Sequence, residues 1–180
     1  MKNYKKNLKI LQDAHVYSKE MEHDACGVGL IASTEGKKSR KVVEYGINAL
    51  KAVWHRGAVD ADGKTGDGAG IHLEIPSDFF TEKIELTGHK HDGSDICVGM
   101  IFLPRNNYSA QENSRTLVES ELTKSNFSIY GWRQVPVNPK VLGEKANLTR
   151  PEITQVLFKH NDKTLTGKDL ERKIYESRRK

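Results

Sequence analysis

The sequence predicts an α+β protein whose strands and helices form a layered sandwich. Apolar runs typical of strands and apolar residues at helical spacing are interleaved along the 180 residues. The strands do not each alternate with a long helix, as they would in a doubly wound parallel sheet. No repeats or low-complexity linker interrupt the pattern. A chain of this length can bury a substantial core, so a single domain is expected.

The first two predicted elements are a strand at 28–32 and a helix at 39–54. Residues 28–32 form a short apolar run, which is typical of a buried strand. Ser39 can cap the helix. Apolar residues then recur at spacings of four, three and four, so they share one helical face. They are Val43, Ile47, Leu50 and Trp54.

A glycine-rich segment at 60–70 comes next and is predicted to form a loop. Apolar residues alternate at 71–75, which indicates a strand with one buried face. Ser77 and Asp78 can start a short helix at 79–83.

The second half of the chain continues the α+β pattern after a polar loop at 87–95. Residues 96–103 are nearly all apolar, which predicts a strand buried on both faces. A capping-box pattern at 109–112 opens a helix that runs to about Lys124. The remaining elements are strands at 127–137 and 153–159 and a helix that begins near Thr166 and continues to the end of the chain.

Composition excludes several classes of protein. Hydrophobic residues make up 36% and charged residues 29%, as expected of a soluble protein. No run approaches the roughly 20 apolar residues that span a bilayer, and residues 1–25 lack the apolar region of a secretory signal. Two distant cysteines suggest a reducing compartment. We therefore expect a cytoplasmic location and no membrane partner.

A basic nucleic-acid-binding module is the alternative from another class. The net charge is +5, and basic residues gather at both ends of the chain. Such a module would present aromatic residues among lysines on one face. Trp54 and Phe102 fall instead within apolar patterns typical of a core, and no recognition motif accompanies the charge. We interpret the basic ends as a solvated tail and a helix end, and expect no nucleic-acid partner.

Cys26 is the candidate catalytic residue. If residues 1–25 are removed as a leader, Cys26 supplies both a thiol and a free α-amine, whose pKa of roughly 7.7–8.0 lets it act as a base near neutral pH. A thiolate next to such a base is a strong nucleophile. Gly27 and Gly29 leave space for a substrate carbonyl. Taken alone, the stretch is more typical of a small buried residue in a strand than of a nucleophile, and the buried residue is how we interpret Cys97.

Arg56 and the segment TGDGAG at 65–70 are further candidates. The Arg56 guanidinium could brace a loop or bind a carboxylate bidentately, or simply favour a helix C-terminus. TGDGAG is not a P-loop because no Gly-Lys-Ser/Thr follows, and a predicted strand rather than a helix comes after it. We interpret it as a tight loop whose backbone passes close to another group, with Asp67 accepting hydrogen bonds from backbone amides.

The segment His89-Lys90-His91-Asp92 contains residue types that bind metals. Two histidines and an aspartate in a polar loop are more typical of a solvated surface. We therefore expect no metal site in this chain.

Taken together, these motifs resemble one family, the class II (N-terminal nucleophile) glutamine amidotransferase domain at the start of the glutamate synthase large chain. The resemblance covers nearly everything from Cys26 onward. It rests on six segments in order: CGVGLIA at 26–32, HRGA at 55–58, TGDGAGI at 65–71, IP and FF within 75–80, GWRQVPV at 131–137 and LERKIYESRRK at 170–180.

The resemblance implies an αββα sandwich of which this chain holds an incomplete, N-terminal part. Residues 1–25 would be a leader, and residues 26–180 part of the amidotransferase domain. Cys26 would attack the side-chain amide of L-glutamine, release ammonia and form a γ-glutamyl thioester that water then hydrolyses. The supporting residues would be Arg56 and Gly27, with Thr65, Gly66, Asp67 and Gly68 in a loop near the site.

The resemblance also implies features of a longer parent enzyme. Ammonia would pass to a second site that converts 2-oxoglutarate to glutamate with FMN and a 3Fe–4S cluster, neither of which is expected in this segment. The partners would be the remainder of the large chain and a small reductase subunit. The family's downstream arginine segment and Asn-Gly oxyanion pair are not in this chain, so we expect the isolated chain to be inactive. The alternative enzyme is another class II amidotransferase or N-terminal nucleophile hydrolase, which TGDGAGI and GWRQVPV disfavour.

Overall fold

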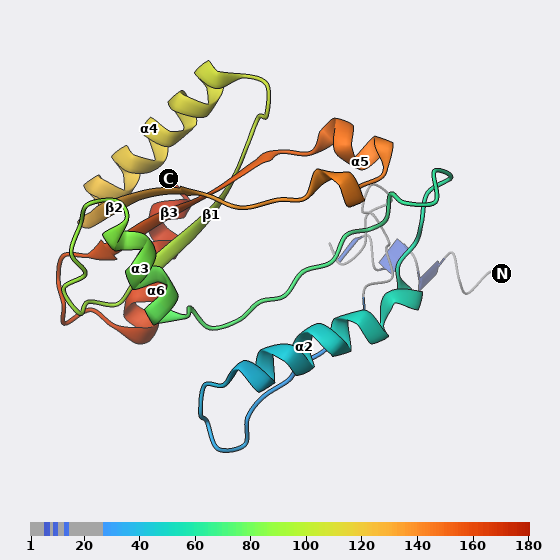
Figure 1. The fold of residues 1–180 in the computed structure, drawn as a ribbon, viewed down its shortest axis with the longest axis horizontal. Helices are drawn as coiled ribbons and strands as arrows, with labels where there is room; N and C mark the ends of the chain where they lie inside the picture. The colour runs from blue at the N-terminus through green and yellow to red at the C-terminus, as the bar shows by residue number, and fades with distance from the viewer. Residues whose placement is uncertain (1–5, 8, 11–12, 15–26) are drawn as a thin grey trace. The chain divides into compact units, whose positions relative to one another are not determined.

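A computed structural model describes residues 6–7, 9–10, 13–14 and 27–180 (Figure 1). These residues form two units. The first holds residues up to Ala58 together with Asp67–Ile71, and the second holds Val59–Gly66 together with His72–Lys180. Helices and strands are mixed, as the sequence predicts. In these ranges no helix combines the length and the apolar character that crossing a membrane requires.

The main element of the first unit is the helix α2, Arg40–Ala52. The Ser39 hydroxyl accepts a hydrogen bond from the Val42 amide, which confirms the predicted cap. The helix ends before Trp54, which belongs to the short 3₁₀ helix η1, Trp54–Arg56. Trp54 is thus outside the helical apolar stripe, and since α2 has no buried residue, no core lies there for it to join; its side chain is 77% exposed. The prediction that Trp54 belongs to a core face is wrong.

The predicted strands at 28–32 and 71–75 are not strands in the structure. Val28 and Leu30 are 91% and 89% exposed. A strand is stabilised by a hydrogen-bonded neighbour and by a buried face. Within the part of the chain that the structure describes, neither segment pairs with another strand. The local apolar pattern was therefore insufficient to form a strand without a partner.

The second unit contains a three-stranded antiparallel sheet with the order β1-β3-β2. Its strands are β1 (Cys97–Leu103), β2 (Phe127–Gln134) and β3 (Glu152–His160). β3 is the central strand, and residues 154–158 are all buried. β1 lies at the edge, with Met100 48% and Phe102 64% exposed. The predictions that 96–103 is buried on both faces and that Phe102 belongs to a core are therefore wrong, because the apolar cluster that Val98 contacts on this face does not extend to Met100 or Phe102.

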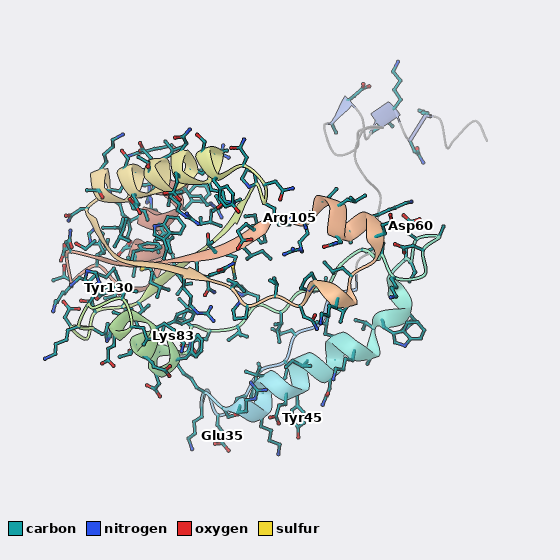
Figure 2. All side chains as sticks on the ribbon, turned by 45° about the horizontal axis from the view of Figure 1, so that its top comes forward. Glu35, Tyr45, Asp60, Lys83, Arg105 and Tyr130 are labelled. Atoms are coloured by element: carbon teal, nitrogen blue, oxygen red, sulfur yellow. The ribbon has the colours of Figure 1, made fainter. Side chains whose placement is uncertain are left out.

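Helices cover the two faces of this sheet, with α4 on one side and α3 on the other (Figure 2). One face is covered by α4 (Tyr108–Lys124) and α6 (Gly167–Arg178), and the other face is covered by α3 (Ser77–Glu85). The larger apolar cluster under α4 and α6 consists of Cys97, Leu122, Phe127, Val156, Phe158 and Leu170. The smaller one under α3 consists of Phe80, Ile84, Tyr130 and Leu157. Successive residues of β3 thus point to opposite faces, as the pleat of a strand requires.

Several element boundaries differ from the sequence prediction. Asn107, rather than Ser109, caps α4, because its side-chain oxygen accepts a hydrogen bond from the Ala110 amide at 2.9 Å. Two short elements were not predicted, the 3₁₀ helix η2, Pro139–Val141, and the helix α5, Glu144–Thr149. Both follow the GWRQVPV segment, and α5 contacts Asp60 and Thr65 of the glycine-rich segment.

Candidate functional site

The candidate nucleophile Cys26 lies outside the described residues. Gly27 begins the continuous described stretch; it is exposed and has no regular secondary structure. The roles of Cys26 and Gly27 therefore remain predictions from the sequence.

The HRGA segment forms the η1 turn and the residues just after it. Arg56 is the last residue of η1, and the Gly57 amide closes the turn by donating to the Trp54 carbonyl at 3.1 Å. The Ala58 amide then donates to the Asp67 carboxylate at 2.7 Å. This bond confirms that Asp67 accepts from a backbone amide. It also brings HRGA and part of TGDGAG together within the first unit.

In the second unit, residues 59–66 form a tight hairpin that leads into the glycine-rich loop. Val59 and Gly66 form an antiparallel bridge, and the Asp60 amide donates to the Thr65 carbonyl at 2.7 Å. Gly63 at the tip has φ +67°, a conformation that favours glycine. We call residues 59–66 the hairpin.

Asp62 organises the inside of this hairpin. Its carboxylate accepts hydrogen bonds from the Thr65 hydroxyl at 2.6 Å, the Thr65 amide at 2.7 Å and the Lys64 amide at 2.9 Å. These bonds hold the pKa of Asp62 well below its ordinary value, and the bond from the Thr65 hydroxyl has the largest effect. Asp62 is therefore a carboxylate at neutral pH. The loop then continues to Gly68, whose φ of +81° again favours glycine.

The start of α5 contacts the hairpin. Figure 2 shows Asp60 beside α5, where Lys145 Nζ lies 2.7 Å from the Asp60 carboxylate. The Ala146 amide donates to the Thr65 hydroxyl oxygen at 3.4 Å. The sequence analysis missed these residues. Only the pattern Gly143-Glu144, typical of a helix start, could have indicated α5, and no local pattern indicates what α5 contacts.

Cys97 is excluded as a nucleophile by its surroundings. It is 3% exposed within the larger apolar cluster, and burial raises the pKa of its thiol to about 12. A thiol with that pKa stays protonated at neutral pH. The interpretation of Cys97 as a structural residue is confirmed.

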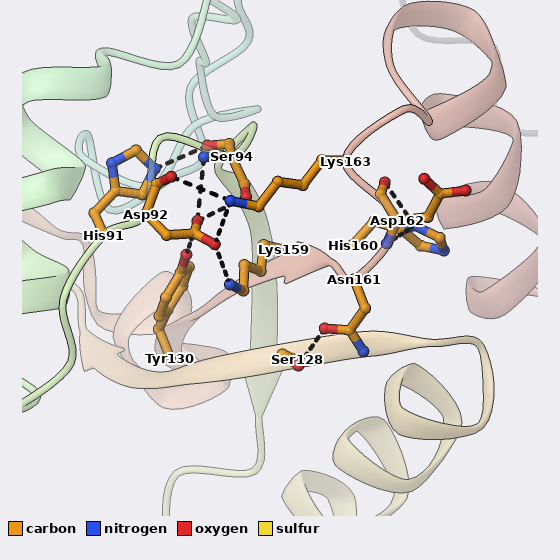
Figure 3. A network of polar contacts seen from close by, with 10 residues as sticks. All are labelled: His91, Asp92, Ser94, Ser128, Tyr130, Lys159, His160, Asn161, Asp162 and Lys163. Atoms are coloured by element: carbon orange, nitrogen blue, oxygen red, sulfur yellow. Dashed lines mark hydrogen bonds and ion pairs between the residues drawn. The ribbon is translucent and has the colours of Figure 1, made fainter.

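The polar loop at 87–95 holds an ion-pair network rather than isolated surface residues (Figure 3). Asp92 lies 2.7 Å from Lys159 Nζ and 3.0 Å from Lys163 Nζ, and it accepts a hydrogen bond from the Ser94 hydroxyl at 2.6 Å. In the ranges that the structure covers, no three His, Cys, Asp or Glu side chains gather as a metal site would require. The network attaches the loop to β3.

The family of the chain follows from comparison with known proteins. Residues 26–180 match the family of class II glutamine amidotransferases. The chain belongs to this family.

The relatives point to one kind of enzyme within it. Over 178 residues, 99% of this chain, the sequence is 51% identical to the glutamate synthase [NADPH] large chain of Azospirillum brasilense. Over 158 residues, 87% of the chain, it is 39% identical to ferredoxin-dependent glutamate synthase 2 of Synechocystis. Over 171 residues, 91% of the chain, it is 34% identical to the glutamate synthase [NADPH] large chain of Bacillus subtilis. The chain spans 12%, 10% and 11% of these relatives, respectively.

Proposed function

We propose that this chain is part of the glutaminase domain of a glutamate synthase, in which Cys26 hydrolyses L-glutamine to glutamate and ammonia. The observation that carries the proposal is the family match, which begins at Cys26 and continues to Lys180. In this proposal residues 1–25 are a leader whose removal makes Cys26 the first residue of the mature protein. The similarity to three glutamate synthases supports this enzyme over other class II amidotransferases.

The chemistry uses two groups of one residue. The α-amine of Cys26 accepts the thiol proton, and the sulfur attacks the side-chain carbonyl carbon of glutamine. The tetrahedral oxyanion collapses when the amine returns its proton to the departing ammonia, which leaves a γ-glutamyl thioester. Water, deprotonated by the same amine, then hydrolyses the thioester and frees glutamate.

The remaining site residues hold the nucleophile and the substrate. Arg56 would brace the N-terminal end that carries Cys26, and Gly27 would leave room for the substrate. Thr65, Gly66, Asp67 and Gly68 would form the loop beside them. The hydrogen bond from the Ala58 amide to Asp67 supports a shared role, because it ties the segment after Arg56 to this loop.

The proposed fold is the αββα sandwich of N-terminal nucleophile enzymes. The sheet face on which α3 packs supports this, because α3 leaves the apolar side chains of Met100 and Phe102 on that face exposed while α4 and α6 cover the opposite face. In an αββα sandwich a second sheet covers such a face. The apolar segments 28–32 and 71–75 have the composition to supply strands to that second sheet.

In the parent enzyme, ammonia would pass to a second site and convert 2-oxoglutarate to glutamate. FMN and a 3Fe–4S cluster would serve that reaction, and a small reductase subunit would deliver electrons. Iron–sulfur clusters are held by several cysteine thiolates. This chain has two cysteines, of which Cys97 is buried in an apolar cluster, so its residues do not fit such a group. The cluster would therefore bind in the remainder of the large chain, where FMN is expected with it.

Substitution of Cys26 in the full-length protein tests the proposed function. We expect Cys26→Ala to abolish glutamate formation from glutamine and to leave glutamate formation from added ammonia intact, because only the first needs the nucleophile. Cys97→Ala is the matched control and should retain glutamine hydrolysis. Intact-mass measurement should show that residues 1–25 are missing from the active protein. Hydrolysis at the normal rate with Met1 still attached would contradict the proposal.

A further inference from the structure

Gly143 occupies a position where no side chain fits. Its φ of −68° and ψ of 163° are accessible to any residue, so backbone conformation does not demand glycine. A Cβ atom there would lie 2.5 Å from the Thr65 amide nitrogen and closer still to the Thr65 hydroxyl and the Asp62 carboxylate. The hairpin therefore fills the space in which a side chain of residue 143 would stand.

Two polar contacts hold the hairpin in that position. Lys145 forms the ion pair with Asp60, and the Ala146 amide donates to the Thr65 hydroxyl oxygen. The two contacts join residues that are 81 and 85 positions apart in the sequence. We call this set of contacts, together with Gly143, the α5 clamp.

The α5 clamp acts on the residues from which the glycine-rich loop starts. Thr65 and Gly66 are at once the last residues of the hairpin and the first of TGDGAG. Glycines give this loop conformational freedom that must be removed if its backbone is to meet a substrate in one geometry. The clamp holds Thr65, and the bond from the Ala58 amide holds Asp67.

We propose that Gly143 and Lys145 are positioning residues for glutamine hydrolysis, which act by holding Thr65 at the start of the TGDGAG loop. The inference rests on the proposed function and deepens it. A substituent at residue 143 displaces the hairpin from α5 and with it the start of the loop. Displacements of about 1 Å near a reacting centre can cost on the order of 100-fold in rate.

The test compares two reactions of the full-length protein. Gly143→Ala should lower kcat/KM for glutamine hydrolysis by about tenfold or more. Glutamate formation from added ammonia should change by less than about twofold, since the inference confines the effect to the glutamine site. Lys145→Gln removes the ion pair without adding bulk, and should lower kcat/KM for glutamine by about two- to fivefold, the effect of one exposed pair.

Two further variants separate positioning from general stability. Lys145→Arg keeps the charge and should restore glutamine hydrolysis. Lys140→Gln removes an exposed lysine of η2, just before α5, and should leave both reactions unchanged. If Gly143→Ala fails to fold and loses both reactions, the Lys145 variants test the inference instead. In that case, equal rates of glutamine hydrolysis by Lys145→Gln and the unsubstituted protein would overturn it.

The outcomes also separate this inference from the proposed function. Normal glutamine hydrolysis by a folded Gly143→Ala variant would overturn the role of the α5 clamp and leave the proposed function standing. Absence of glutamine hydrolysis in the unsubstituted, full-length protein would overturn the proposed function and this inference together.

Discussion

Asp92 joins the loop at 87–95 to the central strand of the sheet through two lysines. Its carboxylate is paired with Lys159 and Lys163, and the hydrogen bond from Lys159 is the largest of the effects that hold its pKa well below the ordinary value of 3.8. Tyr130 lies on the same side, and its hydroxyl is 3.5 Å from Asp92. Burial, followed by the nearby Asp92 charge, raises the pKa of Tyr130 to about 12, so the tyrosine stays neutral and can donate.

This arrangement predicts a pH-dependent contribution to stability. Because the pKa of Asp92 is lower in the folded protein, its stabilising effect is complete above the ordinary value of 3.8 and is lost as the pH falls toward the folded pKa. Asp92→Asn should therefore lower the thermal unfolding midpoint at pH 7, and its difference from the wild type should shrink at pH 3. Asp95→Asn, in the same exposed loop, is the control. A difference that is the same at pH 7 and pH 3 would contradict this prediction.

Among the elements, β2 contains a bulge at a position that requires glycine. The register of β2 against β3 shifts between Ile129 and Gly131, and Gly131 has φ +150°. A Cβ on Gly131 would lie 2.9 Å from the Thr87 methyl carbon. The bulge thus requires glycine both for its backbone and for the close approach of Thr87.

Gly131→Ala should destabilise the fold by about 2 kcal/mol or more, since it combines an unfavourable φ with overpacking. Chemical denaturation would measure the loss. Thr87→Ser removes the methyl group nearest to the new side chain and keeps the hydroxyl that donates to the Ile84 carbonyl at 2.6 Å. The double variant should therefore recover part of the loss. Failure to recover any would show that the contact with Thr87 is not a cause.

The rest of the GWRQ segment connects β2 to its neighbours. The Trp132 indole nitrogen donates to Glu119 of α4 at 2.6 Å, and the Arg115 guanidinium lies 5.8 Å from the centre of the Trp132 ring. Arg133 donates to Gln155 of β3 at 2.6 Å. These contacts give structural roles to side chains of a segment that the sequence predicts as part of a strand and that carries the resemblance to the family.

At the scale of the whole molecule, several large apolar side chains are exposed to solvent. Val28, Leu30 and Phe102 are 91%, 89% and 64% exposed. Apolar surface of this kind is usually covered in a stable protein. We expect these side chains to be buried when residues 28–32 join the proposed second sheet, when that sheet covers Phe102, and when the remainder of the parent enzyme is present.

An isolated polypeptide of residues 26–180 should hydrolyse glutamine at least about 100-fold more slowly than the full-length protein, because the loss of even one oxyanion donor has an effect of that size. It should also aggregate through its exposed strand edge. Glutamine turnover and light scattering of the two proteins, side by side, would measure both effects. Equal turnover would show that residues 26–180 contain the whole catalytic machinery.

The sequence by itself determined the family, the helix capped by Ser39 and the strands of the second unit, because capping residues and local runs of apolar side chains carry that information. Tertiary structure decided that β3 rather than β1 is central and that 28–32 and 71–75 have no partner in the described chain. It also decided that Gly143 must be glycine, since the atoms that exclude a side chain there belong to Asp62 and Thr65. Strand pairing and close packing join distant residues, whereas periodicity and capping report only on near neighbours in the sequence.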